Sequence, residues 1–271
     1  MEMLGLVPKF GLGTFRLKDQ VVTDSVRMAL ELGYRAIDTA QGYGNEAEIG
    51  KVLGESGLSR DALFITTKIM PANYGRDRLV PSLRESVQKL GLDAVDLTLI
   101  HWPAPKGEVK PQEYLTALAE ARDLGLTKQI GVSNFTIQGL KQAREILGDV
   151  PIVTNQVEIH PYLQNRALVD FAKKEGLHLT SYMTLAVGKV MNDEVMQDIA
   201  RQHQATPAQV ALAWALAQGH SVIPSSTRRE NLESNLKALD LKLSEEDMVR
   251  IATLDRDERI ANPPQLAPDW D

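Results

Sequence analysis

The sequence predicts a closed (β/α)8 barrel, and three observations lead to this fold class. Eight short runs of apolar and β-branched residues recur along the 271 residues. Helical patterns lie between these runs, and no Gly/Ser-rich linker, sequence repeat or low-complexity tract interrupts them. Since α/β barrels of this length commonly form one domain, we expect residues 1–271 to form a single barrel domain.

The eight runs are the expected strands of the barrel. They are 10–15 (FGLGTF), 34–40 (YRAIDTA), 63–69 (LFITTKI), 95–101 (VDLTLIH), 128–134 (KQIGVSN), 153–159 (VTNQVEI), 178–184 (HLTSYMT) and 221–226 (SVIPSS). Several are almost continuously apolar, which is typical of parallel strands that are covered on both faces.

The intervening segments show helical periods and helix-start signals. Apolar residues at positions 79, 83, 87 and 90 step by four, four and three, and those at 137, 140, 143 and 147 step by three, three and four. Both patterns fit a helix with one buried stripe. Residues 206–209 (TPAQ) form a capping box with proline at the first helical position, and residues 227–230 (TRRE, from Thr227 to Glu230) form a second such box.

An open doubly wound sheet is the alternative fold. It requires G-x-G-x-x-G after the first strand, but GLGTFR places Arg16 after Gly11 and Gly13, where the third glycine would stand. Residues 255–271 contain three prolines and little periodicity. We expect them to form a non-helical tail near the barrel mouth, which either covers the mouth or hangs free.

The amino-acid composition excludes several classes of function. The chain has 43% hydrophobic residues, a formal net charge of −6 and no cysteine, which excludes disulfides, thiol catalysis and Cys-ligated metals. No basic stripe points to nucleic acid, and no apolar run approaches the roughly 18 residues of a membrane-spanning helix. The N-terminus, MEMLGLVPKFG, lacks the features of a signal peptide. We expect a cytoplasmic monomer without nucleic-acid or membrane partners.

Four ionisable side chains fall at the carboxyl ends of neighbouring strands, where barrel enzymes carry their active sites. Asp38 ends the second run and Tyr43 follows it, while Lys68 and His101 lie at the ends of the third and fourth. Taken singly, each is more often a solvated, rim or ion-paired structural residue. Their coincidence at one end of three adjacent strands favours a catalytic site.

The ends of the later strands carry polar residues, whereas the other four histidines lie elsewhere in the sequence. The ends carry Ser133, Asn134, Gln156, Tyr182, Thr184, Ser225 and Ser226. The remaining histidines are His160 before a proline, His178 at the start of a strand, and His203 and His220 in or after helices. We interpret these four as structural.

The four candidate residues suit acid-assisted reduction of a carbonyl group by a hydride donor. A free phenol titrates near ~10, and a neighbouring ammonium lowers that pKa. We therefore expect Lys68 to tune Tyr43 as general acid and Asp38 to keep Lys68 charged. A neutral His101 would donate a second hydrogen bond to the carbonyl. The glycines on either side of Tyr43 give its loop the freedom to place the phenol over the barrel axis.

The sequence resembles the aldo-keto reductase family over nearly its whole length. The matching segments, in family order, are GLGTF, GYRAIDTAQGYGNE, FITTK, VDLTLIHWP, IGVSNF, NQVEIHPY, SYMTLA and IPSST. Within the family, the chain is most similar to the bacterial 2,5-diketo-D-gluconate reductases of the B type. The resemblance implies reduction of aldehydes and ketones with NADPH/NADP+, and a catalytic tetrad on Asp38, Tyr43, Lys68 and His101.

The resemblance also assigns binding residues. It implies that Ser133, Asn134 and Gln156 hold the nicotinamide amide and that Tyr182 stacks on the ring. The full set expected to bind cofactor is Gly13, Thr14, Asp38, Ser133, Asn134, Gln156, Tyr182, Thr184, Leu185, Ser225, Ser226, Thr227, Arg228, Asn231 and Asn235. The substrate is expected to contact Phe15, Met70, His101 and Trp102, and no metal site is expected.

Three features depart from the family pattern. Ser225 and Asn231 stand where many relatives carry a lysine and an arginine for the 2′-phosphate. Met70 stands where many have tryptophan, and the loop after His101 is short. We expect an open site for small polar carbonyls such as 2,5-diketo-D-gluconate or methylglyoxal.

NADPH is nevertheless the expected cofactor. Ser225, Ser226, Arg228 and Arg229 cluster at a helix start, which is a ready anion site. Solvated arginines are the alternative explanation, and Glu230 places a negative charge nearby.

Two other functions remain open at the level of sequence. Lys68 could act as the nucleophile of a Schiff-base lyase, although Asp38 would hold it protonated and the Ser133, Asn134 and Gln156 set would be unexplained. A cofactor-binding redox-sensing subunit without turnover is the second alternative, against which an intact tetrad argues.

Overall fold

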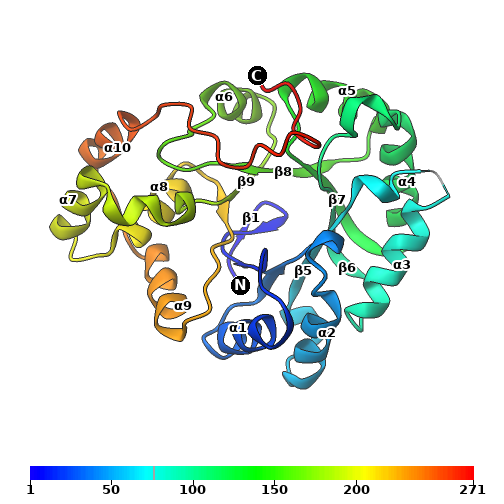
Figure 1. Ribbon diagram of the computed structural model, residues 1–271, viewed down its shortest axis with the longest axis horizontal. Helices are drawn as coiled ribbons and strands as arrows, with labels where there is room; N and C mark the ends of the chain where they lie inside the picture. Colours follow the sequence, from blue (N-terminus) through cyan, green and yellow to red (C-terminus); the bar gives the residue numbers. More distant parts are fainter. Residues whose placement is uncertain (76) are drawn as a thin grey trace.

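The computed structural model describes residues 1–75 and 77–271, in which a ring of parallel strands is surrounded by helices (Figure 1). The strands of the ring are β3 (Leu12–Gly13), β4 (Ala36–Asp38), β5 (Phe64–Ile69), β6 (Val95–Ile100), β7 (Thr127–Ser133), β8 (Ile152–Glu158), β9 (Leu179–Tyr182) and β10 (Ser221–Val222). They pair in chain order and all in parallel. Each predicted run overlaps one of them, and β7 and β8 begin one residue before the predicted run, so the predicted (β/α)8 fold class is confirmed.

The ring closes between its first and last strands. Phe10 forms a parallel bridge with Val222, and the N–H of Gly11 donates to the Val222 carbonyl at 2.9 Å. The close approach explains the glycine at position 13, because a Cβ there would lie 2.5 Å from the carbonyl oxygen of Ile223. Closure brings all the carboxyl ends of the strands to one mouth, and so decides where strand-end side chains can meet.

Helices follow the strands and cover the outside of the ring (Figure 1). They are α1 (Asp19–Glu31), α2 (Glu46–Glu55), α3 (Leu79–Lys89), α4 (Pro111–Asp123), α5 (Ile137–Leu147), α6 (Arg166–Lys174), α7 (Glu194–Gln202), α8 (Pro207–Ala217), α9 (Arg229–Leu236) and α10 (Glu245–Ala252). Short 3-10 turns are η1 (Gln41–Tyr43), η2 (Arg60–Ala62), η3 (Pro71–Asn73), η4 (Pro105–Gly107), η5 (Ala186–Asn192) and η6 (Lys237–Leu239).

Of the two predicted capping boxes, one is confirmed and one is wrong. Thr206 and Gln209 form the reciprocal box at the start of α8. The start of α9 differs, because its N-cap is Arg228 and no side chain caps it. The preceding turn is organised by Ser226, whose hydroxyl accepts the N–H of Arg228 at 3.2 Å. Thr227 therefore lies before the helix and does not cap it.

A two-stranded hairpin that the sequence did not predict precedes the barrel. β1 (Met3–Leu4) pairs antiparallel with β2 (Val7–Pro8), and Gly5 between them has φ 62°. Val7 and Pro8 share the lining of a cavity of about 20 Å³ with barrel-interior residues such as Phe64 and Leu97. The hairpin therefore closes the N-terminal end of the barrel, opposite the mouth.

The hydrophobic core has two layers. A large cluster fills the space between helices and strands and includes fully buried residues such as Ile49, Leu83 and Leu140. Burying one such side chain stabilises the fold by roughly 1.5–3 kcal/mol. A smaller cluster inside the barrel contains Leu97 and Leu99. Neither cluster includes Asp38, Lys68 or His101 at the mouth end of the strands. No helix in the described ranges has the length and apolar character needed to cross a membrane.

The C-terminal tail, residues 255–271, contains no helix and crosses the mouth beside β8 (Figure 1). The N–H groups of Arg256 and Glu258 donate to the carbonyl of Tyr162 at 3.2 and 3.0 Å. At its far end, the carboxylate of Asp271 accepts the N–H of Ile137 in the first turn of α5 at 2.7 Å. Of the two arrangements left open by the sequence, the tail takes the one that covers the mouth.

Candidate active site

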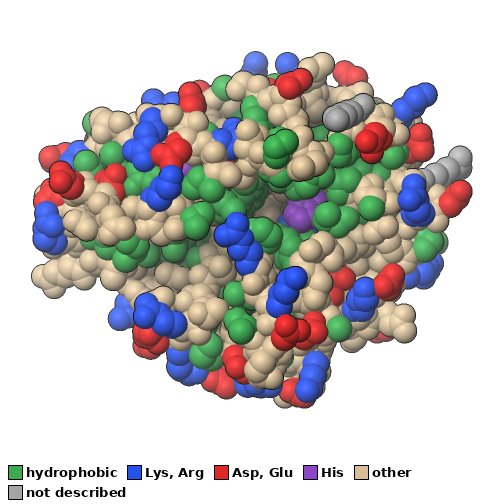
Figure 2. Space-filling model, viewed as in Figure 1, with side chains coloured by type: hydrophobic (Ala, Val, Ile, Leu, Met, Phe, Trp, Pro, Cys, Tyr) green, Lys and Arg blue, Asp and Glu red, His purple; other side chains and the backbone are tan. Residues whose placement is uncertain are grey.

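A cavity of about 810 Å³ opens at the carboxyl ends of the strands. Figure 2 shows its mouth as a hollow in the middle of this face, bordered largely by hydrophobic side chains and with a histidine visible inside. Ligand pockets of small-molecule enzymes typically measure about 300–1,000 Å³. The cavity lies where a barrel enzyme is expected to bind its ligands.

Strand register brings Asp38 and Lys68 together at the floor of this cavity. Asp38 pairs with Thr66 of β5, and Lys68 follows two residues later, so its side chain points to the same side of the sheet. The ammonium group of Lys68 forms an ion pair with Asp38 and donates to the carbonyl of Thr39 at 3.0 Å. It also lies 3.3 Å from the hydroxyl of Tyr43. Lys68 and Asp38 are both buried.

The loop that carries Tyr43 is held by its neighbours on both sides. Gly44 has φ 64°, in the left-handed region that favours glycine. Gly42 packs against Met70, and a Cβ there would lie 2.5 Å from the Met70 sulfur, so a larger residue would displace that side chain. The side-chain amide of Gln41 accepts from the N–H of Met70 at 3.2 Å and from Asn73 at 2.9 Å. The loop is thus anchored beside the cavity, and Tyr43 is among the residues that line it.

The electrostatics of the Tyr43 hydroxyl differ from the expectation. Burial raises the pKa of Tyr43 above its ordinary value, and the charge of Lys68 offsets only part of that increase. For Lys68, burial lowers the pKa of the ammonium group, but Asp38 and Tyr43 more than compensate, so the pKa is raised. The predicted lowering of the Tyr43 pKa is therefore wrong, because desolvation outweighs the charge of Lys68. Lys68 itself stays charged, as expected.

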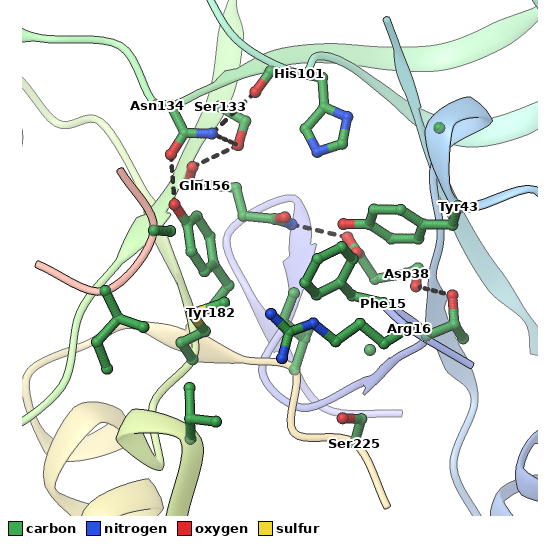
Figure 3. A pocket seen from close by; sticks show the side chains of 18 of the residues that line it. Phe15, Arg16, Asp38, Tyr43, His101, Ser133, Asn134, Gln156, Tyr182 and Ser225 are labelled. Carbon is green, nitrogen blue, oxygen red and sulfur yellow. Dashed lines mark hydrogen bonds between the residues drawn. The ribbon is translucent and has the colours of Figure 1, made fainter. Parts of the chain in front are cut away.

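His101 faces Tyr43 across the cavity (Figure 3). The centroids of the two rings are 5.6 Å apart. Burial, together with the charge of Lys68, lowers the pKa of His101 to about 3. Its Nδ1 is buried and has no hydrogen-bond partner in the described part of the chain. The imidazole is therefore neutral at physiological pH, as the sequence argument required.

A network of polar side chains forms the opposite wall (Figure 3). The hydroxyl of Ser133 donates to the carbonyl of Gln156 at 2.7 Å, and the Asn134 amide donates to Ser133 at 3.1 Å. Tyr182 donates to the amide oxygen of Asn134 at 2.6 Å. The Gln156 amide reaches across the barrel and donates to Asp38 at 2.8 Å. Asn134 has φ 62°, a strained conformation of the kind that concentrates at functional sites.

Most of the predicted binding residues line the cavity. From the cofactor set these are Gly13, Thr14, Asp38, Ser133, Asn134, Gln156, Tyr182, Thr184, Leu185 and Ser225. The four predicted substrate contacts Phe15, Met70, His101 and Trp102 also line it. Tyr43 faces the same space, and Lys68 lies buried beneath it.

The remaining predicted cofactor contacts lie outside the cavity lining. They are Ser226, Thr227, Arg228, Asn231 and Asn235. Arg228 is exposed, donates to Asn231 at 3.3 Å and lies 3.5 Å from the carboxylate of Glu230, whereas Arg229 pairs with Glu31 of α1. The two arginines, equivalent in sequence, are therefore different in their surroundings.

The other four histidines have structural partners or surroundings. His160 bonds to buried Glu158 at 2.8 Å, and His203 bonds to Asp247 at 2.8 Å. His178 is half-buried and bonds to the hydroxyl of Ser221 at 2.8 Å, and His220 is buried; both lie near the opposite end of the barrel. Across residues 1–75 and 77–271, no cluster of three or more His, Asp or Glu side chains is arranged to hold a metal ion.

Sequence reasoning missed several residues that line the cavity. Arg16 lies at the mouth with φ 67° and places its guanidinium beside the cavity, which its position directly after Phe15 could have indicated (Figure 3). The tail contributes Ile260, Ala261, Asn262, Pro263 and Leu266 to the lining. No sequence pattern indicates these tail residues, because only the folded chain brings them to the mouth.

Comparisons with known proteins show the family to which the chain belongs. Residues 9–256 match the profile of the Aldo/keto reductase family. The chain is 60% identical to "Methylglyoxal reductase DkgB" of Escherichia coli O157:H7 over 98% of this chain and 99% of that protein. It is 39% identical to "Glyoxal reductase" of Bacillus subtilis (strain 168) over 96% of this chain and 94% of that protein.

Solved structures show the same fold. A crystal structure provisionally described as a 2,5-diketo-D-gluconic acid reductase B superimposes with a TM-score of 0.94 at 41% identity, covering 97% of this chain and 94% of the other. The aldose reductase of Schistosoma japonicum superimposes with a TM-score of 0.91 at 31% identity, covering 96% and 92%. The predicted carbonyl-reducing oxidoreductase is thereby confirmed at the level of its class, and the chain belongs to the aldo/keto reductase family.

Proposed function

We propose that the protein reduces small carbonyl compounds, methylglyoxal first among them, to alcohols with NADPH. The observation that carries the proposal is the contact of Lys68 with both Asp38 and Tyr43 at the floor of the cavity, with neutral His101 opposite. The 60% identity to a methylglyoxal reductase supports this substrate class. 2,5-diketo-D-gluconate is the second candidate, supported by the likeness to a structure described as its reductase.

The residues at the cavity wall suit a nicotinamide cofactor. Ser133, Asn134 and Gln156 present hydroxyl and amide groups, the complement of a carboxamide, beside the flat ring of Tyr182. Family members typically depend on NADPH or NADH. When bound, such a cofactor supplies the hydride for the carbonyl carbon. The proposed preference for NADPH over NADH rests on Arg228 and the start of α9. Both follow closely in sequence after Ser225, which lines the cavity.

Tyr43 is the proposed general acid. As hydride reaches the carbonyl carbon, negative charge develops on the oxygen, and the Tyr43 hydroxyl transfers its proton there. Lys68 at 3.3 Å stabilises the phenolate that this transfer leaves. Neutral His101 donates an N–H to the same carbonyl oxygen and orients it. Asp38 holds the ammonium in place, and solvent then returns a proton to Tyr43.

The Schiff-base alternative is disfavoured by the same contacts. A nucleophilic lysine must lose its proton, yet Lys68 is buried against Asp38 and its pKa is raised. Borohydride treatment with substrate, followed by mass spectrometry, separates the two mechanisms. We expect no adduct on Lys68.

A carbonyl panel tests the proposal directly. Purified protein is mixed with NADPH and with methylglyoxal, 2,5-diketo-D-gluconate or a generic aldehyde, and oxidation of the cofactor is followed by absorbance. We expect turnover, with methylglyoxal among the best substrates. Failure to oxidise NADPH with any carbonyl would favour the redox-sensing alternative. Light scattering on the same sample tests the expected monomer, and cell fractionation tests the proposed cytoplasmic location.

A further inference from the structure

Glu158 is a fully buried carboxylate that plays no part in the proposed chemistry. It ends β8, two residues after Gln156, and its side chain has 0% exposure. Its Oε2 accepts the backbone N–H of Ala261 at 2.7 Å. Its Oε1 accepts the backbone N–H of Ile260 at 2.7 Å and the ring Nε2 of His160 at 2.8 Å.

The neighbouring contacts fix the direction of these hydrogen bonds. The N–H of Tyr162 donates to Nδ1 of His160 at 3.3 Å, so the imidazole proton lies on Nε2 and points at Glu158. Three N–H donors therefore converge on one carboxylate. A carboxyl group that accepts three N–H donors in this way is ionised, since an ionised carboxylate only accepts hydrogen bonds. Hydrogen bonds to a charged acceptor are about twice as strong as those between neutral groups. Two of the three donors belong to the tail.

The tail residues bound by Glu158 form part of the cavity wall. Ile260 and Ala261 line the cavity, as do Pro263 and Leu266 further along the tail. The tail, drawn as the pale red ribbon in Figure 3, passes on the side of Tyr182, and Tyr43 lies on the other side of the cavity. The position of the Ile260–Ala261 backbone therefore sets the width of the space left for substrate.

Other contacts of the tail are weaker candidates for this anchoring. The ion pair of Lys189 with Glu258 and that of Arg166 with Asp255 involve cations whose side chains are 54% and 60% exposed. Exposed pairs contribute little, typically about 0–1 kcal/mol. The Glu158 contacts are shielded from water and bind the segment that touches the cavity.

We propose that Glu158 is a specificity-determining positioning residue, which holds the tail against the mouth and thereby sets the size of carbonyl compound that the site accepts. The part of this inference that concerns substrate size rests on the proposed reductase function. The anchoring itself does not, so the two are tested by separate measurements.

Hydrogen exchange of the tail tests the anchoring. Glu158→Gln keeps the shape but replaces one oxygen with an NH2 group that faces an N–H donor. We expect exchange in residues 258–266 to rise by roughly 10-fold or more, the effect of weakening a hydrogen bond to a charged group. Glu258→Gln is the matched control, since its ion pairs are exposed, and should leave exchange within about 2-fold of wild type. Unchanged exchange in Glu158→Gln would overturn the proposal.

Kinetics with substrates of two sizes test the specificity. For Glu158→Gln we expect the KM of phenylglyoxal to change by about 10-fold while that of methylglyoxal and both kcat values stay within about 2-fold, because only the larger substrate reaches the tail. Raised exchange with an unaltered KM ratio would overturn the role in specificity. If wild type turns over neither substrate, the proposed function fails, and exchange still decides the anchoring.

A second variant, Ala261→Pro, tests the same contact independently in case Glu158→Gln does not fold. Ala261→Pro removes one of the two tail donors and leaves the barrel untouched. It should raise exchange in the tail and alter the phenylglyoxal KM in the same direction as Glu158→Gln, with an unchanged melting temperature. If Ala261→Pro behaves like wild type in both measurements, Glu158 does not act through the tail.

Discussion

The ammonium nitrogen of Lys68 lies 3.3 Å from the phenolic oxygen of Tyr43. This contact joins the two halves of the site, because Lys68 also pairs with buried Asp38 while the Tyr43 hydroxyl faces the cavity. Burial alone makes a phenolate costly, and the pKa of Tyr43 is indeed raised. A fixed cation next to the hydroxyl lowers that cost at the moment when the proton leaves.

Replacing Lys68 by Met should therefore impair turnover about as strongly as loss of the acid itself. We expect kcat to fall by roughly 10²–10⁴, the typical contribution of general acid catalysis. The variant should also be less stable by roughly 3–5 kcal/mol, because it leaves Asp38 buried without its partner. Steady-state kinetics and urea unfolding measure the two effects. Asp38→Asn should reduce kcat less, because Asp38 acts on Tyr43 only through Lys68. A larger loss of kcat in Asp38→Asn than in Lys68→Met would contradict the assigned roles.

Replacing Arg228 by Ala should weaken NADPH selectively. The guanidinium of Arg228 is exposed beside the start of α9, and loss of a hydrogen bond to the 2′-phosphate should cost roughly 1.5–3 kcal/mol. NADH lacks that phosphate and should bind as before, and the loss should shrink at high salt. Fluorescence titration with each cofactor measures the difference.

The structure supplies a matched control for Arg228. Arg229 is adjacent in sequence, but its side chain pairs with Glu31 on α1. Arg229→Ala should leave the ratio of NADPH to NADH affinity nearly unchanged. Equal losses for both cofactors in Arg228→Ala, or equal kcat/KM for both in wild type, would exclude the proposed phosphate contact.

Acid should destabilise the fold through His178 and His220, near the closed end of the barrel, in addition to His101 in the cavity. Burial lowers the pKa of His178 and of His220 to about 4 each, below the value of about 6.5 of an unfolded histidine. The unfolded chain therefore binds more protons between pH 6.5 and 4, and the free energy of unfolding falls as pH falls through that window. From these pKa values, the loss between pH 7 and pH 5 is about 2 kcal/mol per histidine.

Urea unfolding at pH 7 and pH 5 measures this loss. The double variant His178→Asn with His220→Met removes these two groups but keeps His101, so the free energy of unfolding should depend on pH less steeply than in wild type and still fall somewhat with acid. His203→Gln is the control, because His203 is partly exposed and bonded to Asp247, and should keep the dependence of wild type. A double variant as acid-sensitive as wild type would show that other groups carry the effect.

Local sequence patterns predicted the parts of the site that depend on strand ends. Asp38, Lys68 and His101 are placed by strands with strong apolar patterns, so their convergence followed from the fold class alone. The N-terminal hairpin was missed because its strands have two residues each and carry no period. The start of α9 was misplaced because Ser226, and not Thr227, organises the preceding turn.

Other features depend on contacts that are distant in the sequence. Glu158 receives the N–H of Ile260, 102 residues later, and nothing near either residue indicates the contact. The close packing of Gly42 likewise involves the side chain of Met70, 28 residues later, and is not indicated by the residues around Gly42. The pKa of Tyr43 depends on how completely folding removes water from the phenol, which the sequence does not reveal.

The most direct test of the account is the kcat of Tyr43→Phe with methylglyoxal and NADPH. The substitution removes one hydroxyl and keeps the ring that packs between Phe15 and His101. We predict a loss in kcat of roughly 10²–10⁴, with the affinity for NADPH nearly unchanged. A variant that retains most of the wild-type turnover would contradict the assignment of Tyr43 as the proton donor, and with it the central claim about this site.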